Sequence, residues 1–324
     1  MPATHAEYHA TTQWLPMRVV VVGLGIQGRK RLAAAGDAVV ATVDPVQPGA
    51  VFKALTDVPL GSYDAALVSV PDSAKIELLT YLLDHQKHVL VEKPLLASDD
   101  SVLERLGDLA DRREVACYTA YNHRFEPHFV RMKALLDSGE LGEIYRCRMF
   151  YGNGTARDVR NSPWRDRGAG VLPDLGSHLL DTVLYWFGPR TEPFRVFSCS
   201  RFENAAFDHV VVGADGHPTV ELEMTLLSYR NHFTCDILAE HGSAHIESLC
   251  KWGPSVFTRR RRKLPSGRPD EETITIVGSD PTWELEYVHF LDLCQRGGNN
   301  IENDLVIDRW LRHLGAAAVG KAPA

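Results

Sequence analysis

The run His88-Val89-Leu90-Val91-Glu92-Lys93-Pro94 joins an apolar core to a charged pair and a proline. Its central residues are typical of a parallel strand that is buried on both faces. Proline cannot donate a hydrogen bond to a neighbouring strand, so the strand is predicted to end by Pro94. Ligands of open α/β sheets bind beyond the carboxyl ends of the strands, where Lys93 would present a cation. The alternative is a solvated Glu92–Lys93 pair that merely ends the strand.

A glycine-rich turn precedes this strand in the sequence. Met17–Val22 is predicted to be a strand, and Gly23-Leu24-Gly25-Ile26-Gln27-Gly28 follows it directly, before a helix-prone stretch. In such a turn, Gly23 permits the tight bend, Gly25 lets a pyrophosphate approach the backbone, and Gly28 lets the helix pack on the strand. The free N–H groups of the helix N-terminus then favour phosphate. The motif therefore predicts a dinucleotide-binding Rossmann domain.

An acidic residue supports this interpretation. Asp44 follows the second predicted strand, close to the roughly 20 positions after the glycines at which a carboxylate binds the ribose hydroxyls. The next cation in the sequence is Lys53, so NAD is predicted as the cofactor, with NADP the less favoured alternative. The predicted cofactor contacts are Gly23, Gly25, Ile26, Gln27, Gly28, Asp44, Val70, Pro71, Glu92, Lys93 and Asn122.

The pattern changes after Asn122. Val220, Leu222 and Met224 alternate with polar residues, which indicates an antiparallel sheet with one covered face. We therefore expect an α/β Rossmann domain plus an α+β domain with a large, open, mostly antiparallel sheet. The predicted boundaries are a flexible leader at 1–16, the dinucleotide-binding domain at 17–124 and a substrate-binding and oligomerisation domain at 125–324, whose C-terminal helix can pack back on the first domain.

One face of this second sheet has no predicted helix to cover it. Its alternating positions include Leu, Ile, Met and Phe, and exposed apolar surfaces commonly mark interfaces. The sequence therefore predicts a homodimer or homotetramer packed through the C-terminal sheets.

A second chemical centre is predicted around Gly170–Asp181. Pro173 suits the start of a helix, and Asp174, His178 and Asp181 fall on one face of it. The other positions are mostly apolar, so this narrow polar stripe is expected to line a cavity. The alternatives are a capping Asp174 and a core His178 whose hydrogen bonds are satisfied.

These motifs, taken in order, resemble those of the glucose–fructose oxidoreductase/inositol dehydrogenase (Gfo/Idh/MocA) family. The resemblance rests on the glycine motif, Glu92-Lys93-Pro94, Tyr121–Phe125 and Gly170–Asp181, and it extends from about Met17 to the C-terminus. It implies a nicotinamide-dependent sugar or polyol oxidoreductase with Lys93, Asp174 and His178 as the catalytic group, and a cis Lys93–Pro94 bond. The chain departs from the family pattern after Pro71, where Asp72 and Lys75 replace the common Asn and His.

The expected reaction is hydride transfer between a secondary hydroxyl of a sugar or cyclic polyol and the nicotinamide. His178 is the predicted base, Asp174 orients it or the substrate, and Lys93 stabilises negative charge on oxygen. The residues expected to bind the substrate are Lys93, Tyr151, Asn153, Trp164, Arg165, Asp174 and His178.

Two alternatives remain open from the sequence. The first is a reductase of a keto group on a nucleotide-linked sugar, for which four arginines could bind phosphate: Arg157, Arg160, Arg165 and Arg167. The second is a non-catalytic ligand sensor that binds NAD and needs no proton transfer.

Composition limits the classes of partner. The 324 residues carry a formal net charge of −7, which argues against nucleic acid as a bulk partner. No apolar run approaches the ~20 residues of a membrane span, and residues 1–16 lack the apolar core of a signal peptide. Six cysteines without short pairings are typical of reduced thiols, so a cytoplasmic enzyme with a small-molecule substrate and no metal is expected.

Overall fold

The chain forms two compact units in a computed structural model that describes residues 17–162 and 165–321. Unit 1 comprises 17–92, Asp108–Tyr118 and Tyr287–Asn299, and unit 2 comprises Lys93–Gly107, Thr119–Glu286 and 300–321. The sequence prediction had instead placed one boundary between 124 and 125. The difference arises because later segments join unit 1: the Asn299 side chain donates to Asp111 at 2.7 Å, and the Cys117 N–H donates to the Gly298 carbonyl at 3.3 Å. Periodicity along the chain does not reveal such pairings.

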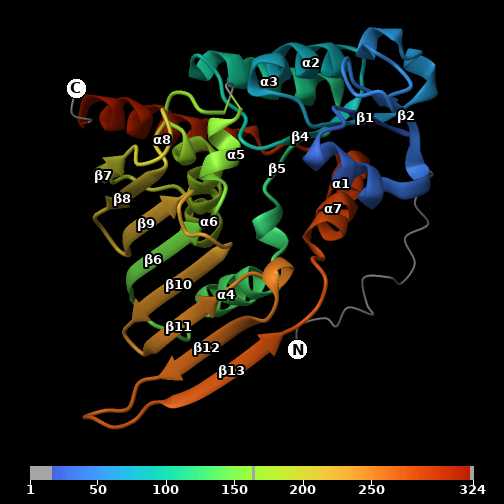
Figure 1. The fold of residues 1–324 in the computed structure, drawn as a ribbon. Helices are drawn as coiled ribbons and strands as arrows, with labels where there is room; N and C mark the ends of the chain where they lie inside the picture. The colour runs from blue at the N-terminus through green and yellow to red at the C-terminus, as the bar shows by residue number, and fades with distance from the viewer. Residues whose placement is uncertain (1–16, 163–164, 322–324) are drawn as a thin grey trace. The chain divides into compact units, whose positions relative to one another are not determined.

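Unit 1 is built on a five-stranded sheet in the order β2-β1-β3-β4-β5 (Figure 1). β1 pairs in parallel with β2 and β3, and β3 pairs in parallel with β4. The four valines of β1 are at most 4% exposed, as expected for a central strand covered on both faces. The elements of unit 1 are β1 (Val19–Val22), α1 (Ile26–Ala35), β2 (Val39–Val43), β3 (Ala65–Val68), α2 (Asp72–Asp84) and β4 (His88–Glu92). Three elements contribute residues to both units: β5 (Cys117–Ala120), α3 (Asp100–Arg113) and α7 (Thr282–Arg296).

Unit 2 is built on an eight-stranded sheet in the order β13-β12-β11-β10-β6-β9-β8-β7. All pairings are antiparallel except that of β6 with β9, which confirms a mostly antiparallel sheet. The elements are α4 (Pro127–Asp137), β6 (Ile144–Gly152), α5 (Ala156–Arg160), α6 (Ser177–Phe187), β7 (Arg195–Ser200), β8 (His209–Ala214), β9 (Thr219–Thr225), β10 (His232–Ala239), β11 (Gly242–Glu247), β12 (Ser255–Arg261), β13 (Asp270–Ile276) and α8 (Ile301–Lys321). In 17–162 and 165–321, no helix has both the length and the apolar composition that a membrane crossing requires.

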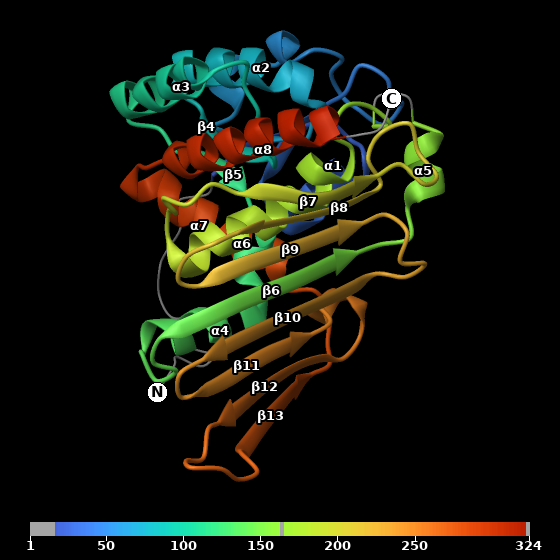
Figure 2. The same cartoon turned by 90° about the vertical axis from the view of Figure 1, so that its left-hand side faces the viewer.

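The two faces of this sheet differ sharply. Helices α4 and α6 lie on one face, whereas the strands β6, β9, β10 and β11 face the viewer uncovered in Figure 2. The alternating apolar residues of β9 and β10, such as Leu222 and Ile237, are fully buried on the covered face. The prediction of an apolar open face is therefore wrong for these residues, although Phe197 of β7 and Leu238 of β10 are exposed, at 51% and 44%.

Most side chains on the open face are polar. Arg148 pairs with Glu221 at 3.0 Å across β6 and β9, and His245 Nδ1 lies 2.6 Å from an Asp236 oxygen across β10 and β11. Strict alternation explains this, because a strand that buries every second residue places the intervening polar ones outside.

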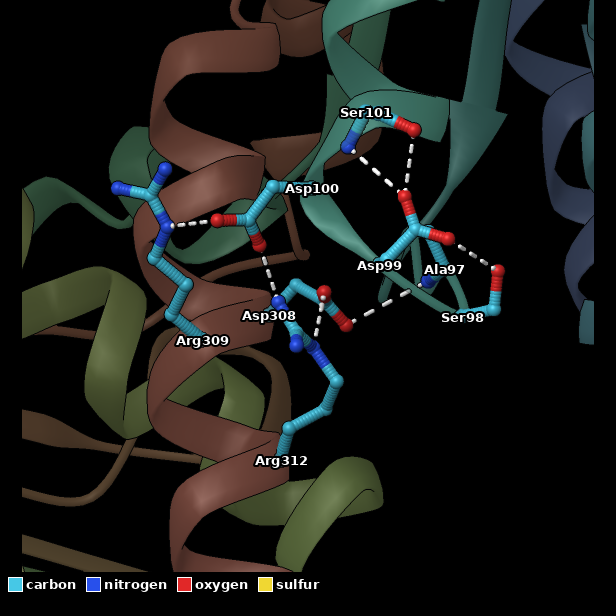
Figure 3. A network of polar contacts seen from close by, with 8 residues as sticks. All are labelled: Ala97, Ser98, Asp99, Asp100, Ser101, Asp308, Arg309 and Arg312. Atoms are coloured by element: carbon cyan, nitrogen blue, oxygen red, sulfur yellow. Dashed lines mark hydrogen bonds and ion pairs between the residues drawn. The ribbon is translucent and has the colours of Figure 1, made fainter.

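The chain that follows Lys93 is tied to α8 by a network of polar contacts (Figure 3). Asp308 of α8 accepts a hydrogen bond from the Ala97 N–H at 3.4 Å and one from Arg312 at 2.8 Å. Arg309 and Arg312 both donate to Asp100 at the start of α3, Arg309 at 2.6 Å. Because Asp308 is only 1% exposed, these contacts fix the backbone a few residues beyond Lys93.

Candidate functional site

The glycine-rich turn of unit 1 has the geometry that its sequence predicts. Gly23 has a φ of +88°, and a Cβ there would lie 2.2 Å from the Ser69 carbonyl oxygen. A Cβ on Gly28 would lie 1.7 Å from the Gly23 carbonyl oxygen, so the packing of α1 requires both glycines. A Cβ on Gly25, which caps α1, would meet nothing within 4 Å. The turn is thus closed on its protein side and open at the helix N-terminus, which fits a pyrophosphate.

Asp44 follows β2 and is 8% exposed. One carboxylate oxygen accepts from the Leu24 N–H at 2.7 Å, and the other accepts from Val46 and Gln47 at 2.8 Å each. Burial raises the pKa of Asp44, but these amides and Lys53 outweigh it and hold the pKa below its usual range. The carboxylate is therefore ionised and fixed beside the glycine turn, with lone pairs left for ribose hydroxyls.

Glu92, a predicted cofactor contact, has another role in unit 1. Its Oε1 lies 2.7 Å from Nε of Arg31, whose side chain is 1% exposed. The sequence analysis missed Arg31, although its signal was present: Arg31 lies three residues after Gly28 on the buried face of α1. Glu92 therefore stabilises a buried guanidinium.

The other predicted cofactor contacts occupy varied positions. Ile26 is 79% exposed at the start of α1, while Val70 and Pro71 follow β3. In unit 2, the Asn122 amide donates to the Thr282 hydroxyl at 2.9 Å. The Gln27 side chain is exposed on α1, and Asp72 and Lys75, where the chain departs from the family pattern, form an ion pair at 2.7 Å.

In unit 2, Asp174 lies in a π-helical turn, η5 (Leu172–Gly176), that runs directly into α6. Such turns are rare and frequent at functional sites. Proline in the first turn is compatible with a helix start, because its missing N–H would have no helical partner there. A Cβ on Gly176 would lie 2.7 Å from the Met224 sulfur, so this glycine lets the turn pack closely on β9.

Lys93 and Asp174 meet in this unit. The Lys93 ammonium donates to the Asp174 carbonyl oxygen at 2.7 Å and lies 3.4 Å from Oδ1. Arg165 donates to the other carboxylate oxygen at 3.2 Å. The Lys93–Pro94 bond is cis, as the resemblance implied. Two cations thus share one carboxylate, and the Lys93 side chain is only 14% exposed.

His178 lies one turn after Asp174 and is 8% exposed. Its ring stacks on His123 with centroids 4.0 Å apart and an angle of 19°, and Tyr151 is 5.9 Å away. Burial lowers the pKa of His178 well below its usual range, and His123, Lys93 and Lys251 lower it further. The imidazole is therefore neutral and able to accept a proton.

Asp181, expected on the same polar stripe, does not join this group. Arg124 binds it through Nε at 3.0 Å and Nη2 at 2.6 Å, and Asp181 is 1% exposed. The stripe predicted on one face of a helix is therefore divided: its first two members lie near Lys93, and its third belongs to a buried ion pair.

Two further predictions for substrate binding have different outcomes. The Asn153 side-chain oxygen accepts from both the N–H and the hydroxyl of Thr155, at 3.1 and 2.8 Å, which is a local turn after β6. Trp164 lies outside the described residues. His123 and Lys251 were not predicted, although the Tyr121–Phe125 motif carried a signal for the first.

Two sequence models of one protein family match the chain. The first, described as an oxidoreductase family with an NAD-binding Rossmann fold, matches residues 17–121. The second, the Gfo/Idh/MocA C-terminal domain, matches residues 129–245. The two matches follow each other along the chain in the expected order and together extend from residue 17 to residue 245.

Among curated relatives, the inositol 2-dehydrogenase of Mycolicibacterium gilvum is 26% identical over 257 residues, which cover 71% of each chain. For other relatives, including the glucose-6-phosphate 3-dehydrogenase of Bacillus subtilis, the chain spans only 34–37% of their length.

Two solved structures share the fold. Levoglucosan dehydrogenase in complex with NADH has a TM-score of 0.80 at 17% identity, covering 94% of this chain and 98% of that one. The UDP-N-acetylglucosamine 3-dehydrogenase of Acidithiobacillus ferrooxidans has a TM-score of 0.76 at 16% identity, covering 94% of this chain and 98% of that one.

Proposed function

The chain belongs to the Gfo/Idh/MocA family of oxidoreductases, and from this premise we propose that it is an NAD-dependent dehydrogenase of a sugar or cyclic polyol. One observation carries the proposal: Lys93 contacts Asp174 in a π-helical turn, one helical turn before the neutral His178, whose pKa Lys93 helps to lower. Alcohol oxidation needs a base that accepts the hydroxyl proton and a cation that stabilises negative charge on the oxygen, and a neutral imidazole and a buried ammonium suit these roles.

Each residue has a distinct task in this reaction. A bound nicotinamide would supply the acceptor for the hydride that leaves the substrate carbon. The chain's own part is His178, which takes the hydroxyl proton as the C=O bond forms. His178 Nδ1 is fully buried, which leaves Nε2 as the nitrogen for the substrate proton. The Lys93 ammonium stabilises negative charge that develops on the oxygen. Asp174, through its contact with Lys93, orients that ammonium and offers an oxygen to a neighbouring hydroxyl.

The cofactor assignment rests on unit 1. The open position at Gly25 and the N-terminus of α1 suit a pyrophosphate, and the ionised Asp44 suits ribose hydroxyls while repelling a 2′-phosphate. These features favour NAD over NADP.

A second candidate substrate class is a nucleotide-linked sugar. Arg165 lies beside Asp174 and is one-third exposed, so it is placed to contact an anionic group of a substrate. The fold shared with a UDP-sugar dehydrogenase supports including this class. Arg160, by contrast, is paired with Glu203 at 3.4 Å.

Two further parts of the proposal concern the whole molecule. All six cysteines are free thiols, which suits the reducing cytoplasm. A homodimer or homotetramer through the open sheet face is also proposed. The support is the extent of the uncovered strands and not an apolar surface.

The test is a panel of sugars, polyols and nucleotide sugars, each offered with NAD and with NADP, and followed by NADH or NADPH absorbance. We expect turnover of at least one cyclic substrate with NAD preferred. A protein that binds NAD tightly and turns over no member of the panel would instead be the non-catalytic sensor.

A further inference from the structure

His123 and Lys251 form a contact that the proposed reaction does not use. His123 lies in a short 3₁₀ turn, η4 (Asn122–Phe125), and Lys251 lies in another, η6 (Cys250–Trp252), 128 residues later. The Lys251 ammonium is 3.4 Å from Nε2 of His123. The His123 ring also stacks on the ring of His178, and the two ring centroids are 4.0 Å apart. Lys251 is thus linked to the proposed base through one intervening imidazole.

The contact fixes where the His123 proton resides. An ammonium can only donate, so Nε2 of His123 must accept, and a neutral ring then carries its proton on Nδ1. If both stacked rings were protonated, two positive charges with ring centroids 4.0 Å apart would repel each other. A cation beside His123 therefore keeps that ring neutral, and it leaves the charge produced by proton abstraction to His178 alone.

We propose that Lys251 and His123 are positioning residues that hold His178 in its neutral, proton-accepting form and fix the plane of its ring. This inference rests on the proposed function for its catalytic consequence, although its effect on the histidines exists without substrate. Lys251 acts through His123, which it contacts directly, and His123 acts through the stacked ring.

The surroundings of Lys251 are built to hold it in place. Glu126, which is 1% exposed, accepts from the Cys250 N–H at 2.9 Å and from its thiol at 3.0 Å, which anchors η6. The Lys251 ammonium lies 4.8 Å from the Trp252 ring centre, a favourable cation–π distance. A lysine that served only as a solvated surface charge would need no contacts of this kind, so these contacts favour a positioning role for Lys251.

The charged groups around the histidine pair act in one direction, because each of them lowers the pKa of a ring. Burial is the largest cause that lowers the pKa of His123, followed by Lys251 and Lys93. The groups that face the pair from neighbouring elements are Lys93, Lys251 and Tyr151, whose ring centroid lies 5.4 Å from that of His123 and 5.9 Å from that of His178. Among them, Lys251 is the cation in direct contact with His123, so its removal is the most specific perturbation.

The first experiment follows the histidine side chains by NMR in full-length protein labelled at histidine nitrogen, with His123→Phe and His178→Asn used to assign the signals. In Lys251→Met, we expect the titrations of both rings to move to higher pH, because a neighbouring positive charge has been removed. Lys251→Arg should restore the wild-type titration. The matched control is Lys133→Met, which removes a lysine paired with Asp137 on α4 and should move neither ring. Identical titrations in Lys251→Met and wild type would overturn the proposal.

The second experiment measures the pH dependence of kcat for oxidation. The acid limb should move to higher pH in Lys251→Met, so that turnover near pH 6 falls several-fold more than turnover near pH 8. In a His123→Phe background, which keeps a stacked ring without nitrogen, the shift caused by Lys251→Met should shrink. An equal shift of the acid limb in both backgrounds would show that Lys251 does not act on His178 through His123. If no substrate is turned over, the proposed function fails, while the NMR titration still decides the histidine–lysine contact.

Discussion

The glycine turn of unit 1 and the Lys93–Asp174–His178 group of unit 2 are assembled in opposite ways. The turn consists of backbone within six consecutive residues, and its requirements are steric: a Cβ at Gly28 would strike Gly23. The group consists of side chains 81 positions apart for Lys93 and Asp174, and its requirements are electrostatic. A local motif can be read from spacing, whereas a group assembled from distant segments needs the fold. Substitutions in the two regions should therefore fail differently.

The largest effect is expected at His178. Loss of a general base lowers kcat by roughly 10²–10⁴-fold, so His178→Asn should fold and bind NAD but lose turnover to that extent. In the wild type, the acid limb of oxidation should lie below the ~6.5 of an ordinary histidine, since burial lowers the pKa of His178 and activity requires the neutral ring. Stopped-flow kinetics measure the turnover of the variant, and NAD titrations measure its affinity for the cofactor. A variant with unchanged kcat and pH profile would leave the base unassigned.

Lys93→Met sharpens the comparison, because Lys93 directly follows the strand that ends at Glu92. If its ammonium stabilises charge on the substrate oxygen, kcat should fall by roughly 10²–10³-fold while NAD affinity changes little. Glu92→Gln is the matched control: it perturbs the ion pair with Arg31 and should lower the stability of unit 1 more than the rate. Near-normal turnover in Lys93→Met would mean that Lys93 has no catalytic role and is only part of the charged pair that ends the strand.

Arg124→Met tests whether the third member of the polar stripe is structural. The variant leaves the Asp181 carboxylate buried without its guanidinium, and breaking a buried ion pair in this way costs about 3–5 kcal/mol. We expect a large loss in the free energy of unfolding by denaturant titration, with kcat nearly unchanged in the fraction that remains folded. A kcat loss as large as that of His178→Asn, without a loss of stability, would return Asp181 to the active site.

The sequence predicted the turn, Asp44 and the existence of two chemical centres because each depends on local spacing. It also predicted that the two sheets differ, since alternation distinguishes a sheet covered on one face from one covered on both. It did not foresee the ion pairs of Glu92 and Asp181, because the arginines that bind them lie 61 and 57 positions away, and the cofactor contact of Glu92 stays a prediction. It missed His123 and Lys251 for the same reason, and it mistook the buried apolar residues of β9 and β10 for a surface.

Asp44 is the position at which unit 1 can be altered most selectively. Asp44→Ala removes the charge that would repel a 2′-phosphate, so the preference for NAD over NADP should relax by roughly tenfold or more. The same change removes an acceptor of three backbone hydrogen bonds. Because the pKa of Asp44 is lowered, its contribution to stability is present above the ordinary ~3.9 of an aspartate and is lost as pH falls through the lower folded value.

Two measurements check this. The ratio of kcat/KM for the two cofactors reports the preference, and the difference in thermal stability between wild type and Asp44→Ala should shrink as the pH is lowered below 4. An unchanged cofactor ratio would mean that Asp44 serves only the turn and the loop after β2.

The smallest effect is expected on the open face of the unit 2 sheet. Arg148 is 48% exposed and pairs with Glu221 and Glu223, and such surface pairs contribute about 0–1 kcal/mol. Arg148→Ala should therefore barely change the unfolding free energy of a monomer at high dilution. In an assembly that covers this face, however, the same arginine would be desolvated, and leaving its carboxylate partners buried would cost considerably more.

We expect light scattering at micromolar concentration to give a dimeric or tetrameric mass for the wild type and a lower mass for Arg148→Glu, which places three carboxylates side by side. Lys133→Glu on α4, away from the open face, should keep the wild-type mass. A monomeric wild type would show that a polar sheet face of this extent is stable in water without a partner.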